Sequence, residues 1–91
     1  MTSYKALKNH AGAQARVLTT ENGLVLYSYR TEVIKLENDW LECYGLYSMT
    51  TRKHIGWFLR EYLPQFSFQD IKLLYNAGMK MNIVTGECVK P

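Results

Sequence analysis

The stretch that decides the fold is "ENGLVLYSYRTEVIKLEND", residues 21–39. It opens on Asn22-Gly23 between β-favouring residues, the strongest short-range signal for a β-hairpin. The next segment, Leu24–Leu36, is rich in branched and aromatic residues, and its side chains alternate between two faces. We therefore predict one long strand over Leu24–Leu36, with a second turn at Glu37–Asp39.

The flanking segments extend this sheet. Ala13–Thr20 suits a strand that pairs across the first turn, and Trp40–Tyr47 suits one that follows the second. Met79–Val84 alternates in the same way, which allows a last strand at a sheet edge. Met1–Gly12 is ambiguous, because its apolar residues have weak helical spacing and Gly12 ends whatever forms there.

The hydrophobic period changes from 2 to 3.6 after the third strand. Apolar residues at i, i+3, i+4 and i+7 predict an amphipathic helix that Pro64 stops; they are Ile55, Phe58, Leu59 and Tyr62. A second helix begins at Ser67, with Asp70 as its capping partner, and stops at Gly78. Thr85–Pro91 has the character of a tail.

These elements predict an α+β fold formed by a single domain over residues 1–91. It consists of a small antiparallel sheet of three to four strands, with two helices packed on one face. The composition, 47% hydrophobic and 21% charged, is that of an ordinary globular chain. A chain of this size has room for one core and one small functional surface.

Charge and aromatic content restrict the partners. The net charge of +3 is well short of the Lys/Arg density of a dedicated nucleic-acid binder, and it argues against an acidic DNA mimic. The chain has seven tyrosines and two tryptophans. These residues favour binding surfaces, but they are also good strand formers, so the count alone leaves both readings open.

The cysteines and histidines predict neither a metal site nor a cofactor site. Cys43 and Cys88 have no CxxC companion, and His10 and His54 lack the spacing of zinc ligands. No leader pattern and no apolar run of about 20 residues is present. We expect a cytoplasmic protein with two reduced thiols and no membrane partner.

The sequence also predicts that the protein is not an enzyme. It contains no G-x-S-x-G elbow, and His54 has no evident carboxylate to orient it. Thr50 and His54 share a predicted helix face, which capping and surface exposure explain more simply than a catalytic pair. The carboxylates of residues 32–42 cluster around a turn, where solvation accounts for them.

The start of the first predicted helix carries positive charges where negative ones are expected. Hydroxyl residues are followed by Arg52 and Lys53 where a helix N-terminus, itself partially positive, should begin. These groups together can hold a phosphate or carboxylate; alternatively, Thr50 or Ser48 caps the helix and the cations point into water. The candidate partner- or anion-binding residues are Ser48, Thr50, Thr51, Arg52, Lys53, His54 and Trp57. Trp57 suits either a second core face or an interface anchor.

Three segments, "NHAGAQARV", "LYSYRTEVIKLEN" and "YSMTTRKHIGWFL", together resemble a family of small, uncharacterised phage and prophage proteins. The resemblance covers Asn9–Leu59. Its most specific residues, here called the signature, are Ser28, Tyr29, Thr31, Val33, Tyr47, Ser48, Thr50, Thr51 and His54. The family has no assigned activity, and residues 64–91 lie outside the resemblance.

The resemblance implies a compact protein made in the cytoplasm of a bacterial host. We expect a non-enzymatic binding protein that inhibits a host protein or ribonucleoprotein complex, such as a defence nuclease, in the manner of anti-CRISPR proteins. The alternatives are a nucleic-acid-binding or regulatory module, which would use Arg16, Arg30, Arg52, Lys53 and Arg60, and a small hydrolase. An exposed last strand would also allow a homodimer.

Overall fold

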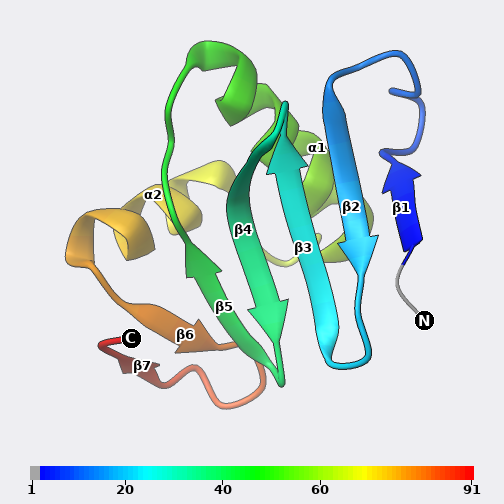
Figure 1. Cartoon of the computed structure of the whole chain (residues 1–91). Helices are drawn as coiled ribbons and strands as arrows, with labels where there is room; N and C mark the ends of the chain where they lie inside the picture. Colours follow the sequence, from blue (N-terminus) through cyan, green and yellow to red (C-terminus); the bar gives the residue numbers. More distant parts are fainter. Residues whose placement is uncertain (1–2) are drawn as a thin grey trace.

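The computed structural model describes residues 3–91, which form one seven-stranded antiparallel sheet and two helices (Figure 1). The strands lie in the sheet in the order in which they occur in the chain. They are β1 (Ser3–Ala6), β2 (Ala15–Thr19), β3 (Gly23–Ser28), β4 (Thr31–Glu37), β5 (Trp40–Cys43), β6 (Lys80–Asn82) and β7 (Cys88–Val89). The sheet is therefore a meander.

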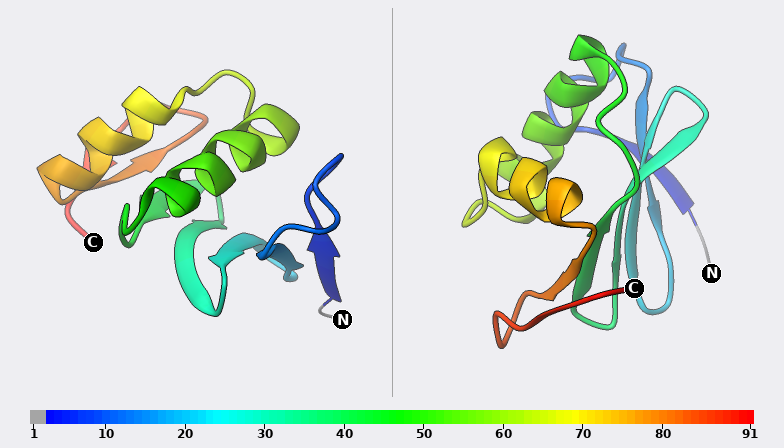
Figure 2. Two further views of the ribbon diagram at one scale, coloured as in Figure 1. Left: turned by 90° about the horizontal axis from the view of Figure 1, so that it is seen from above. Right: turned by 90° about the vertical axis from the view of Figure 1, so that its left-hand side faces the viewer.

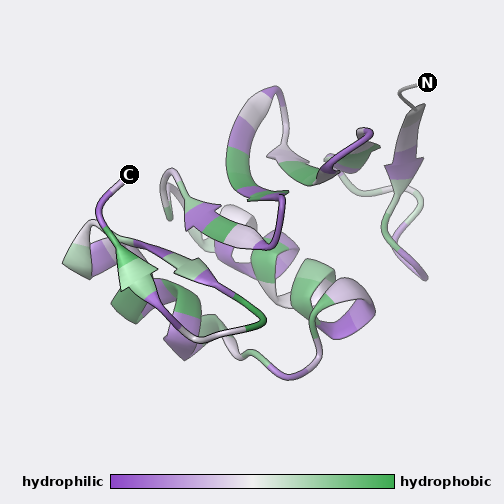
Figure 3. Ribbon diagram, turned by 90° about the horizontal axis from the view of Figure 1, so that it is seen from below, coloured by the Kyte–Doolittle hydropathy of each residue, from purple (hydrophilic) through white to green (hydrophobic). Residues whose placement is uncertain are grey.

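Both helices lie between β5 and β6 in the chain and pack on the same side of the sheet (Figure 2). They are α1 (Met49–Tyr62) and α2 (Phe68–Ala77). Along strands and helices, hydrophobic and hydrophilic residues alternate (Figure 3), as expected for elements with one face on a core. The largest fully buried side chains include Phe58, Leu26 and Ile34, and they fill the layer between helices and sheet.

The strand number is the main correction to the predicted fold. The sheet has seven strands rather than three to four, within an α+β domain. The predicted strand Leu24–Leu36 is two strands, because the chain turns at Tyr29 and Arg30 and pairs Ser28 with Thr31. Tyr29 has a φ of 59°, a left-handed conformation that a tyrosine rarely adopts, so its residue type gave no sign of a turn.

The other two unpredicted strands lie near the chain ends. β1 comes from the ambiguous first segment, of which Met1 and Thr2 lie outside the described residues, and it pairs with β2 in a regular register. β7 comes from the predicted tail and pairs with β6 across a turn at residues 83–87. Both strands are short, and a pattern of two to four residues is too brief for alternation to be detected.

The two predicted turns exist, with geometry that explains their residues. Between β2 and β3, Gly23 does not occupy a left-handed turn position; a Cβ there would meet the Leu36 carbonyl oxygen of β4. Glycine is needed for this close approach of two backbones. Between β4 and β5, Asn38 and Asp39 have φ values of 52° and 71°, as in a two-residue type I′ hairpin turn.

The second helix begins and ends as its sequence predicts. Ser67 Oγ accepts a hydrogen bond from the Asp70 backbone N–H, and the Asp70 carboxylate accepts one from the Ser67 N–H. This is a complete capping box. Gly78 closes the helix in a left-handed conformation, with a φ of 66°. No helix within residues 3–91 combines the length and apolarity that a bilayer crossing requires.

Candidate functional site

Two distant parts of the signature meet where β3 ends and α1 begins. The Ser28 hydroxyl lies 2.8 Å from His54 Nδ1 and 3.0 Å from the Thr51 hydroxyl. The Thr51 hydroxyl is in turn 3.3 Å from the Ser48 hydroxyl, and the Ser48 hydroxyl accepts a hydrogen bond from the Thr51 backbone N–H. We call the three buried residues, Ser28, Thr51 and His54, the buried polar network; the exposed Ser48 lies next to it. The network ties the first turn of α1 to the sheet.

Two left-handed residues direct the chain into this network. Tyr29 follows Ser28 with a φ of 59°, and Tyr47 precedes Ser48 with a φ of 40°. Tyrosine adopts this conformation at an energetic cost, which the surrounding structure must offset. The Tyr29 ring lies 5.8 Å from the His54 ring, so the turn that exposes Tyr29 also places it beside the network.

The histidine of the network is held neutral. His54 is 2% exposed, and this burial lowers its pKa below the ordinary 6.5; His10 lowers it further. The His10 ring stacks on Trp57 at 3.6 Å between centroids, and Trp57 lies 5.4 Å from His54. A small cleft of 180 Å³ lies beside this stack, lined by Lys8, Asn9, His10, Trp57, Arg60 and Glu61.

The structure separates the residues of the predicted binding site. Thr51 and His54 are 3% and 2% exposed, so both face inward and cannot contact a partner in this fold. Ser48, one of the two residues proposed as the N-cap, caps α1. Thr50, the other, lies in the first turn of the helix and is exposed. Trp57 is half-buried and packs against both the core and His10, and its role as an interface anchor stays a prediction.

The cations at the start of α1 have different surroundings. The Arg52 guanidinium lies over the Phe68 ring at 5.9 Å from its centroid, which joins the start of α1 to the start of α2. Lys53 is exposed. A contact with Phe68 thus offsets the unfavourable position of Arg52 without a bound anion. Ser48, Thr50, Lys53 and the exposed part of Arg52 remain a predicted partner surface.

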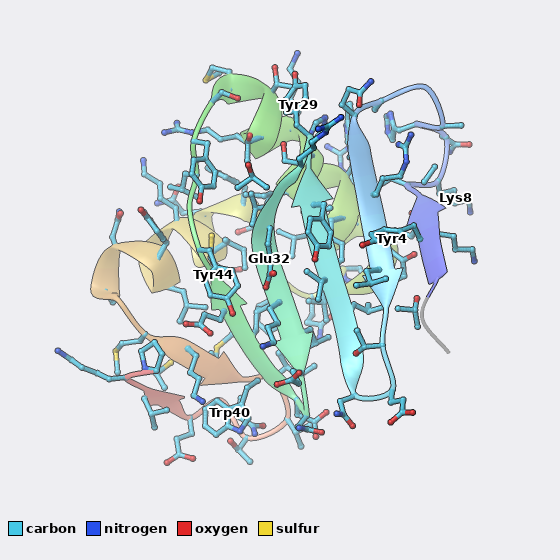
Figure 4. The ribbon with its side chains drawn as sticks, in the orientation of Figure 1. Tyr4, Lys8, Tyr29, Glu32, Trp40 and Tyr44 are labelled. Carbon is cyan, nitrogen blue, oxygen red and sulfur yellow. The ribbon has the colours of Figure 1, made fainter. Side chains whose placement is uncertain are left out.

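A second surface was not located from the sequence. The side of the sheet turned away from the helices is uncovered, and aromatic side chains stand on it (Figure 4). We call it the outer sheet face and define it by Tyr4, Tyr27, Glu32, Lys35, Trp40, Glu42 and Tyr44. Tyr4 is 63% exposed and Tyr44 38%. Val25, buried but outside the main core cluster, lies beneath these side chains.

Carboxylates lie among the tyrosines of this face. Burial raises the pKa of Tyr27, and Glu32, its cross-strand partner, raises it further. Burial also raises the pKa of Tyr44 to about 12; the charge of Glu42 and a hydrogen bond with its side chain contribute next, followed by the charges of Glu32 and Glu37. The charge of Glu32 therefore acts on both Tyr27 and Tyr44. In Figure 4, Glu32 lies between Tyr44 and Tyr4 on this face.

One end of the outer sheet face is hollowed. Lys35, Glu37, Trp40, Glu42 and Lys80 line most of a polar hollow of 250 Å³. Lys35 pairs with Glu37 at 3.6 Å, and Lys80 lies over the Trp40 ring at 5.1 Å. The available sequence signal was the alternation of tyrosines along Leu24–Leu36. That alternation places Val33 on the same face as Tyr27, whereas the turn at Tyr29 and the register shift that follows it bury Val33 in the core.

The remaining candidate groups are dispersed. Cys43 is buried and Cys88 exposed, and both are free thiols. No group of three potential metal ligands occurs among residues 3–91. An apolar hollow of 450 Å³ lies between α2 and the β6–β7 hairpin, with Phe66, Leu74 and Met81 in its wall.

The chain belongs to a family of unknown function, DUF8033, whose model matches residues 1–71. The match contains the whole signature, β1 to β5 and α1, and it ends within α2. Neither a curated protein nor a solved structure matches the chain.

Proposed function

We propose that this protein acts by binding a macromolecular partner rather than by catalysing a reaction. The partner is a host protein or ribonucleoprotein complex, which the bound protein inhibits. The observation that carries the proposal is the outer sheet face, an uncovered sheet surface that presents Tyr4, Trp40 and Tyr44 (Figure 4), with Tyr27 5.9 Å from Tyr4 between ring centroids. Tyr and Trp give large contact areas with a polar end, and interfaces are enriched in them.

The buried polar network supports binding rather than hydrolysis. The Ser28 hydroxyl and His54 Nδ1 are as close as a nucleophile and its base, but both side chains are only 2% exposed. A substrate needs an opening to the nucleophile. In this fold, the network instead connects the start of α1 to the end of β3 in the sheet.

The inhibitory role and the phage origin rest on the resemblance of the signature to small phage and prophage proteins. Small phage proteins commonly act by binding host machinery, and anti-CRISPR proteins are one such class. A preformed surface on a chain of 91 residues suits this mode of action, because little conformational entropy is lost when it binds.

The test compares two double variants with the wild type in capture from bacterial host lysate. Tyr27→Ala/Tyr44→Ala removes aromatic groups from the outer sheet face, and Arg52→Ala/Lys53→Ala changes the start of α1. We expect a saturable partner to be retained by the second variant and lost by the first. The captured complex should lose activity when the wild-type protein is added. Equal capture by all three proteins, or no capture, would reject the proposal.

Nucleic-acid binding is the second candidate, because Lys53 and Arg60 are exposed on α1 and the net charge is +3. Such binding would lose affinity steeply as salt rises. It would also be reduced by Arg52→Ala/Lys53→Ala and spared by the tyrosine variant, the reverse of the expected pattern.

A further inference from the structure

We infer that the partner segment that docks on the outer sheet face is cationic: a stretch of protein that presents Arg or Lys side chains. This inference rests on the proposed binding function and adds the chemistry of the partner. It follows from three properties of the face: carboxylates that form no ion pair within residues 3–91, cations that are already engaged, and aromatic rings beside both.

The first property is the position of the carboxylates. Glu32 lies across from Tyr27 on the neighbouring strand, and it acts on Tyr44 as well. Glu42 lies beside Tyr44. Within residues 3–91, neither Glu32 nor Glu42 forms an ion pair. Both side chains are partly buried, so their attraction for a cation is screened less than that of a fully exposed carboxylate.

The second property is that nearby cations are already engaged. Lys35 pairs with Glu37, and Lys80 lies over Trp40. The Arg16 guanidinium donates hydrogen bonds to the Ala13 and Ala15 carbonyls at 2.9 Å and 3.0 Å. The centre of the face, over β4 and β5, therefore carries three carboxylates, Glu32, Glu37 and Glu42, and one cation, Lys35, which lies across from Glu42 and pairs with Glu37.

The third property is the aromatic character of that centre. A guanidinium or ammonium group gains from lying over a tyrosine ring while it pairs with a neighbouring carboxylate. Tyr27 and Tyr44 flank Glu32, so one Arg side chain can make both contacts. The protein as a whole is positive, at +3, and repels cations at long range. Binding of a cationic segment must therefore come from this local surface.

The experiment uses a fluorescein-labelled peptide of alternating Arg and Thr, with a citrulline-Thr peptide as its matched neutral probe. Fluorescence anisotropy measures binding to the intact protein. We expect saturable binding of the Arg peptide, weakened by salt, and at least about tenfold weaker binding of the citrulline peptide.

Two charge-neutralising variants locate the binding surface. Glu32→Gln/Glu42→Gln should weaken Arg-peptide binding by about fivefold or more, because it removes two partly buried carboxylates that can pair with the peptide's arginines. Glu87→Gln removes an exposed carboxylate in the β6–β7 turn and should leave binding unchanged. Circular dichroism and the urea midpoint verify that each variant is folded.

Several outcomes would overturn the inference: no binding of the Arg peptide, equal binding of the citrulline peptide, or unchanged binding to the Glu32/Glu42 variant. Failure of the broader proposal is distinguishable. If host-partner capture is lost in Tyr27→Ala/Tyr44→Ala but kept in Glu32→Gln/Glu42→Gln, the protein binds through this face and the partner segment is not cationic.

Discussion

At the residue scale, Ser28 is the connection on which the buried polar network depends. Its hydroxyl is within hydrogen-bond distance of both His54 and Thr51, which come from a helix 20 or more positions later in the chain. No pattern in the sequence assigns a serine in a strand to a histidine in a helix. The resemblance singled out both residues without showing that they touch.

Ser28→Ala tests the energy of this connection. The substitution leaves His54 Nδ1 buried without its hydroxyl partner, and we expect the free energy of unfolding to fall by about 1–3 kcal/mol. Urea denaturation measures the change. Thr50→Ala is the matched control, because Thr50 is exposed and lies one helical turn before His54. It should lower the free energy of unfolding by less than about 0.5 kcal/mol. Equal effects of the two variants would contradict the network.

The depressed pKa of His54 predicts a loss of stability in mild acid. In the unfolded chain the pKa of His54 returns to about 6.5, so below that pH the unfolded state binds a proton that the folded state resists. The stabilisation is fully present above the unfolded pKa and is lost as the pH falls through 6.5 towards the lower folded value.

Urea midpoints at about pH 8 and about pH 5.5 measure this loss, in a range where carboxylates stay mostly ionised. His10 is the titratable group that faces His54, since its charge also lowers the His54 pKa. His10→Gln should therefore reduce the loss without removing it. A midpoint that does not change between the two pH values would contradict a buried, neutral His54.

At the element scale, the two helices were predictable from the sequence, whereas the turn at Tyr29 and the short terminal strands were not. The stripe of Ile55, Phe58 and Leu59 faces the core as its spacing predicts, and the α2 capping box is present. The turn at Tyr29 was missed because a tyrosine in a left-handed conformation carries no local signal. It is imposed by tertiary contacts, which include the pairing of Ser28 with the start of α1.

Gly23→Ala tests why glycine begins β3. A Cβ at this position would overlap the Leu36 carbonyl oxygen, so β3 and β4 would have to separate. We expect a loss of about 1–3 kcal/mol in the free energy of unfolding. Gly12→Ala is the control, because a Cβ there has open space around it. A thermal melt in which Gly23→Ala matches the wild type would exclude the close approach.

At the scale of the whole molecule, the two thiols report on the integrity of the core. Cys88 is exposed, whereas Cys43 is buried and its Sγ donates a hydrogen bond to the Gly45 carbonyl at 3.6 Å. Burial raises the pKa of the Cys43 thiol, which lowers its thiolate fraction and its reactivity.

With Ellman's reagent we expect one thiol of the native protein to react promptly and the second to react only as fast as the core opens. Cys88→Ser should abolish the prompt phase, and urea should merge the two phases. Two prompt thiols in the native wild type would contradict the packing of β5 against the helices.

The order of the strands has a consequence for how the chain folds. From β1 to β5, each strand pairs with the strand that precedes or follows it in the chain, so these pairings close short loops. The pairing of Leu41 with Met81 instead joins a residue that precedes both helices in the sequence to one that follows them. Loop-closure entropy favours the short-range hairpins first. We therefore expect residues 3–43 to assemble early, with β6 joining the sheet only after the helices have docked.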